Sequence, residues 1–212
     1  MSHDQARFVQ RRHFMQAWAS ALATAIAPSV AAGPANAQAA TDLPSRATLE
    51  AVAEALLPRS DTPGAIDTGV TAWILGTAWH QKLRPAERTL LSTGLAALDG
   101  AAMESLGMSF SKLSEARRTQ MLATIDAGAL DPTPPAGEDA AVQRAMRDFW
   151  VTLKRLVIAG HYTSEAGCRA ELDFRPVPGP FIGDRPMTSE SRTYYQDWIG
   201  VPFFPGSPGA GA

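Results

Sequence analysis

The stretch VQRAMRDFWVTLKRLVIAG, residues 142–160, decides the fold of this chain. Its large apolar residues recur every three or four positions, which is the spacing of one face of an α-helix. The members of that face are Val142, Met146, Phe149, Trp150, Leu153, Leu156 and Val157. The helix is predicted to end near Gly160, because glycine is common just past helix C-termini. A helix with so wide an apolar face must pack against other elements, which the rest of the chain has to supply.

Four further helices are predicted before this one. Ser45 caps the first, whose apolar face is Leu49, Val52, Ala53, Leu56 and Leu57, and Pro58 ends it. The second opens at Asp67 or Thr68 and carries Val70, Trp73, Ile74 and Trp79. The third begins with Pro85 and has Leu91, Leu95, Leu98, Ala102 and Leu106 on one face. The fourth follows Ser114, with Met121, Leu122 and Ile125 inward.

The sequence therefore predicts an all-α fold, a small bundle of about five helices over residues 38–171. No strand-like alternation persists along the chain. Gly94 either weakens the third helix or lets a neighbouring element approach closely. The run from Asp126 to Asp139, rich in proline and glycine, is predicted as a loop. Ser164-Glu165 is predicted to open a short final helix.

The N-terminus has the order of a secretory signal. Arg11 and Arg12 precede Phe14 and Met15, a mildly apolar stretch follows over residues 17–32, and small residues end at Ala37. Paired arginines before a bulky apolar pair indicate a twin-arginine signal over residues 1–37. Cleavage is predicted after Ala37, with Ala39 as the alternative. The alternative is an amphipathic N-terminal helix of a cytosolic protein. Nothing elsewhere in the chain is long and apolar enough to predict a membrane helix.

Composition excludes several kinds of site. The formal net charge is −2 and no basic stripe is present, so nucleic acid is not expected as a partner. Cys168 is the one cysteine, which cannot by itself hold an iron–sulfur cluster, a c-type haem or an all-cysteine zinc ion. His80 and His161 have no carboxylate at metal-ligand spacing. We therefore predict no catalytic, cofactor-binding or metal-binding residue in this chain.

Residues 58–65, PRSDTPGA, predict a shaped turn. Pro58 and Pro63 fix φ, and Gly64 permits positive φ. Ser60, Asp61 and Thr62 are expected to bond local backbone groups, and for Asp61 this is favoured over acid–base chemistry.

Residues 172–212 differ from the helical part of the chain in composition, and we predict that they form an extended arm. Its prolines forbid long helices, yet it carries Phe174, Phe181, Tyr194, Tyr195, Trp198, Phe203 and Phe204. Leaving these rings in water would expose a large apolar area, so they are expected to pack on something. We predict that the arm wraps another subunit, with Phe181, Tyr194, Tyr195 and Trp198 at the interface. The alternative is an arm folded back on its own bundle.

Cys168, just before the arm, is predicted to be either buried and inert or near that interface in an intersubunit disulfide.

These segments resemble the gluconate 2-dehydrogenase subunit 3 family. The resemblance rests first on the twin-arginine signal, the segment Leu49-Glu50-Ala51-Val52, and the turn with Pro58, Asp61, Thr62, Pro63 and Gly64. Later in the chain it rests on the pair Phe149-Trp150 and on the segment from Gly160 to Gly167, which includes Tyr162, Thr163, Ser164 and Glu165. The motif Pro178-Gly179-Pro180 in the arm is the last of these features. The chain departs from the family pattern at two places, with His161-Tyr162 in place of an aromatic pair and Ser60 in place of threonine.

The resemblance implies a small, non-catalytic subunit of a periplasmic dehydrogenase held at the inner membrane through its partners. The large partner in this family binds FAD and oxidises a sugar or sugar acid, and a multi-haem cytochrome c often passes the electrons to quinone. The small subunit has no cofactor of its own and carries the signal for the twin-arginine translocase. Gluconate, glucose, fructose and lactose are all compatible as substrates. A stand-alone periplasmic helical binding or structural protein and a self-sufficient enzyme are the alternatives.

Overall fold

The computed structural model describes residues 43–129, 138–174, 184, 186–189, 191–192 and 194–195. Several predictions concern residues outside this range: the signal with Arg11, Arg12, Phe14 and Met15, the cleavage site at Ala37, the Pro178-Gly179-Pro180 motif, and the interface residues Phe181 and Trp198. Tyr194 and Tyr195 are described through their backbone alone.

The described residues are mainly helical, as predicted. The elements are α3 (Arg46–Leu56), α4 (Val70–Trp73), the π-helix η1 (Ile74–Lys82), α5 (Pro85–Leu106), the 3₁₀ turn η2 (Phe110–Lys112), α6 (Glu115–Ala129), α7 (Glu138–Tyr162) and α8 (Glu165–Glu171). Two short strands follow, β1 (Asp173–Phe174) and β2 (Tyr194–Tyr195). The five predicted helices correspond to α3, α4 with η1, α5, α6 and α7, and α8 is the predicted short final helix.

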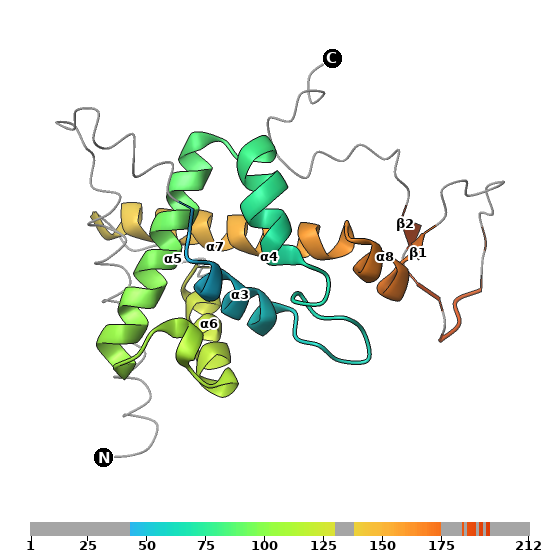
Figure 1. Cartoon of the computed structure of the whole chain (residues 1–212), viewed down its shortest axis with the longest axis horizontal. Coiled ribbons are helices and arrows are strands. Elements are labelled where there is room, and N and C mark those ends of the chain that lie inside the picture. Colours follow the sequence, from blue (N-terminus) through green and yellow to red (C-terminus); the bar gives the residue numbers. More distant parts are fainter. Residues whose placement is uncertain are drawn as a thin grey trace.

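Helix α7 runs along the length of the bundle and contacts α4, α5, α6 and α8 (Figure 1). Its predicted apolar face is confirmed from Met146 onward: Met146, Phe149, Trp150, Leu153, Leu156 and Val157 are all buried. These side chains form one core with Leu49 and Val52 of α3, Leu91, Leu95 and Leu98 of α5, and Ile125 of α6. The periodicity of residues 142–160 thus determines how the bundle is organised.

Gly94 of α5 is where the ring of Phe149 approaches the helix backbone. A Cβ placed on Gly94 would lie 2.2 Å from Cδ2 of Phe149, far inside van der Waals contact. The close-approach interpretation of Gly94 is therefore confirmed. The absence of a side chain here lets α5 and α7 come together around a fully buried aromatic ring.

The predicted helix starts are confirmed at three residues. The hydroxyl of Ser45 accepts a hydrogen bond from the backbone amide of Thr48 at 3.3 Å. Pro85 is the first residue of α5, a position whose N–H would have no acceptor within the helix, so a proline costs no hydrogen bond there. The hydroxyl of Ser164 accepts from the amide of Gly167 at 3.0 Å and opens α8.

Two predicted boundaries are wrong. The second helix starts at Val70 and not at Asp67 or Thr68, because both of those side chains bond elsewhere, and Gly69 precedes the helix with a left-handed φ of 69°. The loop predicted from Asp126 begins only after Ala129. Asp126 stays in α6 because its carboxylate accepts hydrogen bonds from the indole of Trp150 at 2.6 Å and from the ammonium of Lys154 at 2.8 Å.

The root of the C-terminal arm lies beside α8. Strands β1 and β2 pair in parallel, with Asp173 opposite Tyr194 and Phe174 opposite Tyr195. The guanidinium of Arg192 donates a hydrogen bond to the carbonyl of Ala170 at 2.6 Å, in the last turn of α8. Arg192 and strand β2 therefore lie beside the start of the arm. Whether the aromatic rings cover a second subunit stays a prediction.

Candidate functional site

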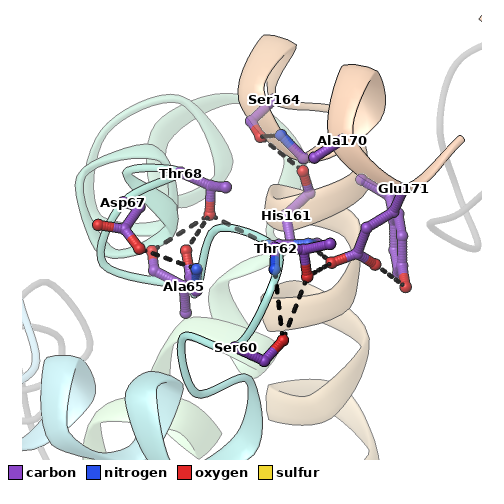
Figure 2. Close-up of polar contacts among 12 residues, drawn as sticks. Ser60, Thr62, Ala65, Asp67, Thr68, His161, Ser164, Ala170 and Glu171 are labelled. Carbon is purple, nitrogen blue, oxygen red and sulfur yellow. Dashed lines mark hydrogen bonds and ion pairs between the residues drawn. The ribbon is translucent and has the colours of Figure 1, made fainter.

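The site is the place where the turn at residues 58–69 meets the end of α7 and the last residue of α8 (Figure 2). These are the two segments that the sequence analysis singled out most strongly, and about a hundred residues separate them along the chain. The structure brings them together through a small group of polar side chains.

The turn is held in shape by its own backbone and by one carboxylate. The amide of Ala65 donates to the carbonyl of Leu57 at 2.9 Å, which closes the turn on the end of α3. Asp67 accepts a hydrogen bond from the amide of Gly64 at 2.9 Å and forms an ion pair with Arg59. Hydrogen bonding to Arg59 and to the Gly64 amide lowers the pKa of Asp67 below its usual value. The turn is thereby fixed in a single shape against α3.

Asp61 does not have the predicted role in this turn. Its side chain is exposed, and it makes no hydrogen bond within the described part of the chain. Asp67 is the residue that bonds the backbone instead. The hydroxyl of Ser60 takes a weaker part by accepting from the amide of Thr62 at 3.4 Å. The turn was therefore predicted only in part: Ser60 bonds the local backbone as expected, but the Thr62 hydroxyl bonds Glu171 and Asp67 takes the place of Asp61. Gly64 does not adopt a positive φ. A Cβ there would lie 2.7 Å from the amide nitrogen of Arg59, so glycine is needed for close approach of the backbone.

Glu171, the last residue of α8, joins the two segments. One carboxylate oxygen, Oε1, accepts a hydrogen bond from the Thr62 hydroxyl at 2.8 Å and lies 3.2 Å from Nε2 of His161. The other, Oε2, accepts from the Tyr162 hydroxyl at 2.7 Å. Nδ1 of His161 lies 3.2 Å from Oγ1 of Thr68. We call Thr62, Thr68, His161, Tyr162 and Glu171 the Glu171 cluster.

The electrostatics of the Glu171 cluster favour an ionised carboxylate. Partial burial of Glu171 opposes ionisation, but hydrogen bonds from Tyr162, Thr62 and His161 outweigh it, so its pKa lies below the usual value. The hydrogen bond that the Tyr162 hydroxyl donates to Glu171 also raises the pKa of the Tyr162 phenol. His161 is 1% exposed, so its ring cannot exchange these partners for water. The cluster therefore holds the turn, α7 and α8 together with charge-assisted bonds.

A family model described as gluconate 2-dehydrogenase subunit 3 matches residues 44–179. The chain belongs to this family. The match spans α3 to α8, β1 and the first residues of the arm, and so it includes every member of the Glu171 cluster. No curated protein and no solved structure matches the chain.

The Tyr162–Glu165 segment, which carries part of the family resemblance, lies at the junction between α7 and α8. Tyr162 bonds Glu171, and the Thr163 hydroxyl donates to the carbonyl of Ala159 at 2.6 Å. Ser164 caps α8, as described above. Glu165 is exposed and forms an ion pair with Arg169 at 3.0 Å. Three of the four residues thus shape the junction between α7 and α8.

Helix α8 packs closely against this junction. A Cβ on Gly167 would lie 2.3 Å from the carbonyl oxygen of His161, so a larger residue would push α8 away from α7. The next residue, Cys168, is 8% exposed, and burial raises the pKa of its thiol. A buried thiol with a raised pKa is a poor nucleophile in disulfide exchange. The intersubunit disulfide at Cys168 stays an untested hypothesis, and it would require this side chain to be uncovered.

Sequence reasoning missed the role of Glu171, Thr68 and His161. It looked for a carboxylate at the short spacing of a metal site, whereas Glu171 follows His161 by ten residues across a helix break at Ser164. That break turns the chain so that the carboxylate faces back to the ring. Among the described residues, no group of three or more His, Cys, Asp or Glu could hold a metal ion. In the same residues no helix is long and apolar enough to cross a bilayer.

The cap at Ser164 gives a direct test of the junction. Ser164→Ala removes the acceptor for the Gly167 amide and the donor to the His161 carbonyl, so we expect a loss of about 1 kcal/mol in the free energy of unfolding. Urea unfolding measures this. Ser105→Ala is the control, because Ser105 is an exposed serine in α5 whose hydroxyl bonds only a carbonyl of its own helix, and a change within about 0.5 kcal/mol is expected there. Equal losses in both variants would contradict a special role for Ser164.

Proposed function

We propose that this chain is the non-catalytic small subunit of a periplasmic FAD-dependent dehydrogenase that oxidises a sugar or sugar acid. It binds the flavoprotein subunit and carries it out of the cytoplasm through the twin-arginine translocase. The complex passes its electrons to a multi-haem cytochrome c and then to quinone. FAD and haem c belong to the partners in this proposal, and the small subunit meets the inner membrane through them.

Membership of the gluconate 2-dehydrogenase subunit 3 family is the observation that carries the proposal. The paired arginines support the export role, because a flavoprotein that takes up FAD in the cytoplasm has to cross the membrane folded. The Glu171 cluster holds the turn at residues 58–69 and the junction of α7 with α8 in place, so both segments present a defined surface to a partner. The arm, which leaves the bundle beside α8, offers the partner a second contact.

Export gives the experiment that tests this proposal. We expect Arg11→Lys combined with Arg12→Lys to leave the flavoprotein subunit in the cytoplasm when the two subunits are expressed together. Arg7→Lys is the matched control, since it makes the same change near the pair but leaves the pair intact. Cell fractionation with immunodetection of both subunits gives the result. A flavoprotein that still reaches the periplasm with the doubly changed signal would refute the export role.

Activity measurements on the separately purified subunits test the proposal that the small subunit is not catalytic. The flavoprotein subunit is expected to oxidise its sugar with an artificial electron acceptor, and the small subunit alone is not. Turnover of a sugar by the purified small subunit would instead establish the self-sufficient enzyme. A small subunit that does not co-purify with the flavoprotein of its own operon would favour a stand-alone binding or structural protein.

A further inference from the structure

The turn at residues 58–69 combines a fixed backbone with an exposed outer side. The backbone is held by the carboxylate of Asp67, which accepts from the Gly64 amide, and by the Thr62 hydroxyl, which donates to Glu171. Residues 58–61 and Ile66 are nevertheless exposed, and the turn projects from the bundle beyond the end of α3 (Figure 1). A loop that is already held in one shape loses little conformational entropy when a partner covers it. The turn therefore has the properties of a recognition element.

Arg59 is oriented by the turn while part of its guanidinium stays available. Nε donates to one carboxylate oxygen of Asp67 at 2.8 Å, and Nη2 donates to the other. The third nitrogen, Nη1, makes no hydrogen bond within the described part of the chain, and the side chain is 73% exposed. A bidentate pair of this kind fixes the plane of the guanidinium. Nη1 is therefore held in a defined place, from which it can donate to a carboxylate of another chain.

Ile66 adds an apolar side chain next to this arginine, because it directly precedes Asp67. It is 55% exposed, although its backbone is fixed: the amide of Gly69 donates to its carbonyl at 3.1 Å, and the preceding Ala65 is completely buried. Isoleucine is branched at Cβ and has few rotamers, so its side chain loses little entropy on being covered. Most of the gain from covering its apolar surface therefore remains for binding.

The position of the turn indicates which partner it meets. A single exposed apolar residue is common on protein surfaces and carries no argument alone. Here it lies beside an oriented arginine, and arginines with apolar neighbours are frequent at the centre of protein interfaces. The turn is also bonded through Thr62 to Glu171, the last residue of α8, and the arm begins directly after it. A partner that binds the arm root therefore also lies within reach of the turn.

We propose that Arg59 and Ile66 dock this chain onto the flavoprotein subunit. Ile66 enters an apolar recess of the flavoprotein, and Nη1 of Arg59 donates to a carboxylate at the rim of that recess. This inference rests on the proposed function and adds to it the place and the chemistry of the contact between the subunits.

Titration of the purified flavoprotein subunit with the full chain tests the contact. We expect Ile66→Ala and Arg59→Gln each to weaken the association about tenfold. Met103→Ala is the control for Ile66→Ala, since Met103 is 52% exposed in the last turn of α5, across the bundle from the turn (Figure 1). Arg46→Gln is the control for Arg59→Gln, because Arg46 is 62% exposed and pairs with Glu50 in α3. Both controls should stay within about twofold of wild type.

The outcomes separate this inference from the proposed function. The side chain of Ile66 takes no part in the hydrogen bonds of the turn, so Ile66→Ala keeps the test valid even if Arg59→Gln loosens it. Wild-type affinity in both variants would overturn the docking role of the turn and leave the proposed function intact. A wild-type chain without affinity for the flavoprotein would overturn both. If light scattering shows that the full chain dimerises by itself and that Ile66→Ala is monomeric, the turn binds a second copy and the inference is wrong.

Discussion

Gly94→Ala is expected to lower the free energy of unfolding by about 2 kcal/mol, even though alanine is a better helix former than glycine by about 1 kcal/mol. The new methyl group would lie 2.2 Å from the ring of Phe149, and that ring is fully buried and cannot swing into solvent. Either α5 and α7 move apart or the ring leaves its preferred rotamer, and both outcomes loosen the core. Urea or thermal unfolding measures the loss.

Gly100→Ala in the same helix is the matched control. A Cβ at Gly100 meets no atom within 4 Å, and the residue is exposed. Only the helix preference acts there, so stability should rise by about 0.5–1 kcal/mol. A double-mutant cycle with Phe149→Leu completes the test, because a smaller side chain should relieve part of the loss caused by Gly94→Ala. A Gly94→Ala variant as stable as Gly100→Ala would show that the core has room the structure does not indicate.

The core of the bundle could be predicted because it follows from one local rule. Apolar residues three and four apart share a helix face, and that rule found the buried side of α7 and the faces of α3 and α5. The caps at Ser45 and Ser164 were predicted from a serine at each helix start. Each of these features depends on neighbours within a few positions along the chain. Gly94 was noted as a glycine inside a predicted helix, but only the packing against Phe149 decides between a weak point and a close approach.

The candidate site could be predicted only in part because it depends on contacts over long sequence distances. The turn and the Tyr162–Glu165 segment were both identified, but nothing in the sequence shows that Thr62 and Glu171, 109 positions apart, would bond. Asp61 was predicted as the carboxylate of the turn, but Arg59 and the Gly64 amide lie beside Asp67 in space, and this contact could not be foreseen from the sequence. The start of α4 was misplaced for the same reason, since Asp67 and Thr68 serve tertiary bonds rather than a helix cap.

Glu171→Ala is expected to lower the free energy of unfolding by about 3 kcal/mol, because it removes the shared acceptor of three donors. His161 is affected most, since its ring is buried and cannot turn to water. Glu165→Ala is the matched control: Glu165 lies in the same helix, but its side chain is 79% exposed, so a loss below about 0.5 kcal/mol is expected. Comparable losses in the two variants would contradict the central role of the Glu171 cluster.

The same carboxylate predicts how stability depends on acid. The pKa of Glu171 is lower in the folded chain than in the unfolded one, so the unfolded chain binds its proton first as the pH falls. Its contribution is therefore complete above the unfolded pKa, near 4.3, and is lost as the pH falls through the folded pKa. Glu171→Gln cannot titrate, so the difference in stability between wild type and this variant should shrink as the pH is lowered from about 5 to about 3. A difference that stays constant over that range would mean that Glu171 does not hold its charge in the folded chain.

Partner binding connects this prediction with function. The Glu171 cluster fixes α8, and α8 carries both Cys168 and the root of the arm, where Arg192 bonds the carbonyl of Ala170. If the flavoprotein binds through the arm, Glu171→Ala should reduce the amount of flavoprotein that co-purifies with the small subunit, while Glu165→Ala should not. The comparison is made at a temperature where both variants are folded by circular dichroism, so that a loss of binding is not simply a loss of fold. A folded Glu171→Ala chain that retains its partner fully would place the binding surface elsewhere on the bundle, away from α8.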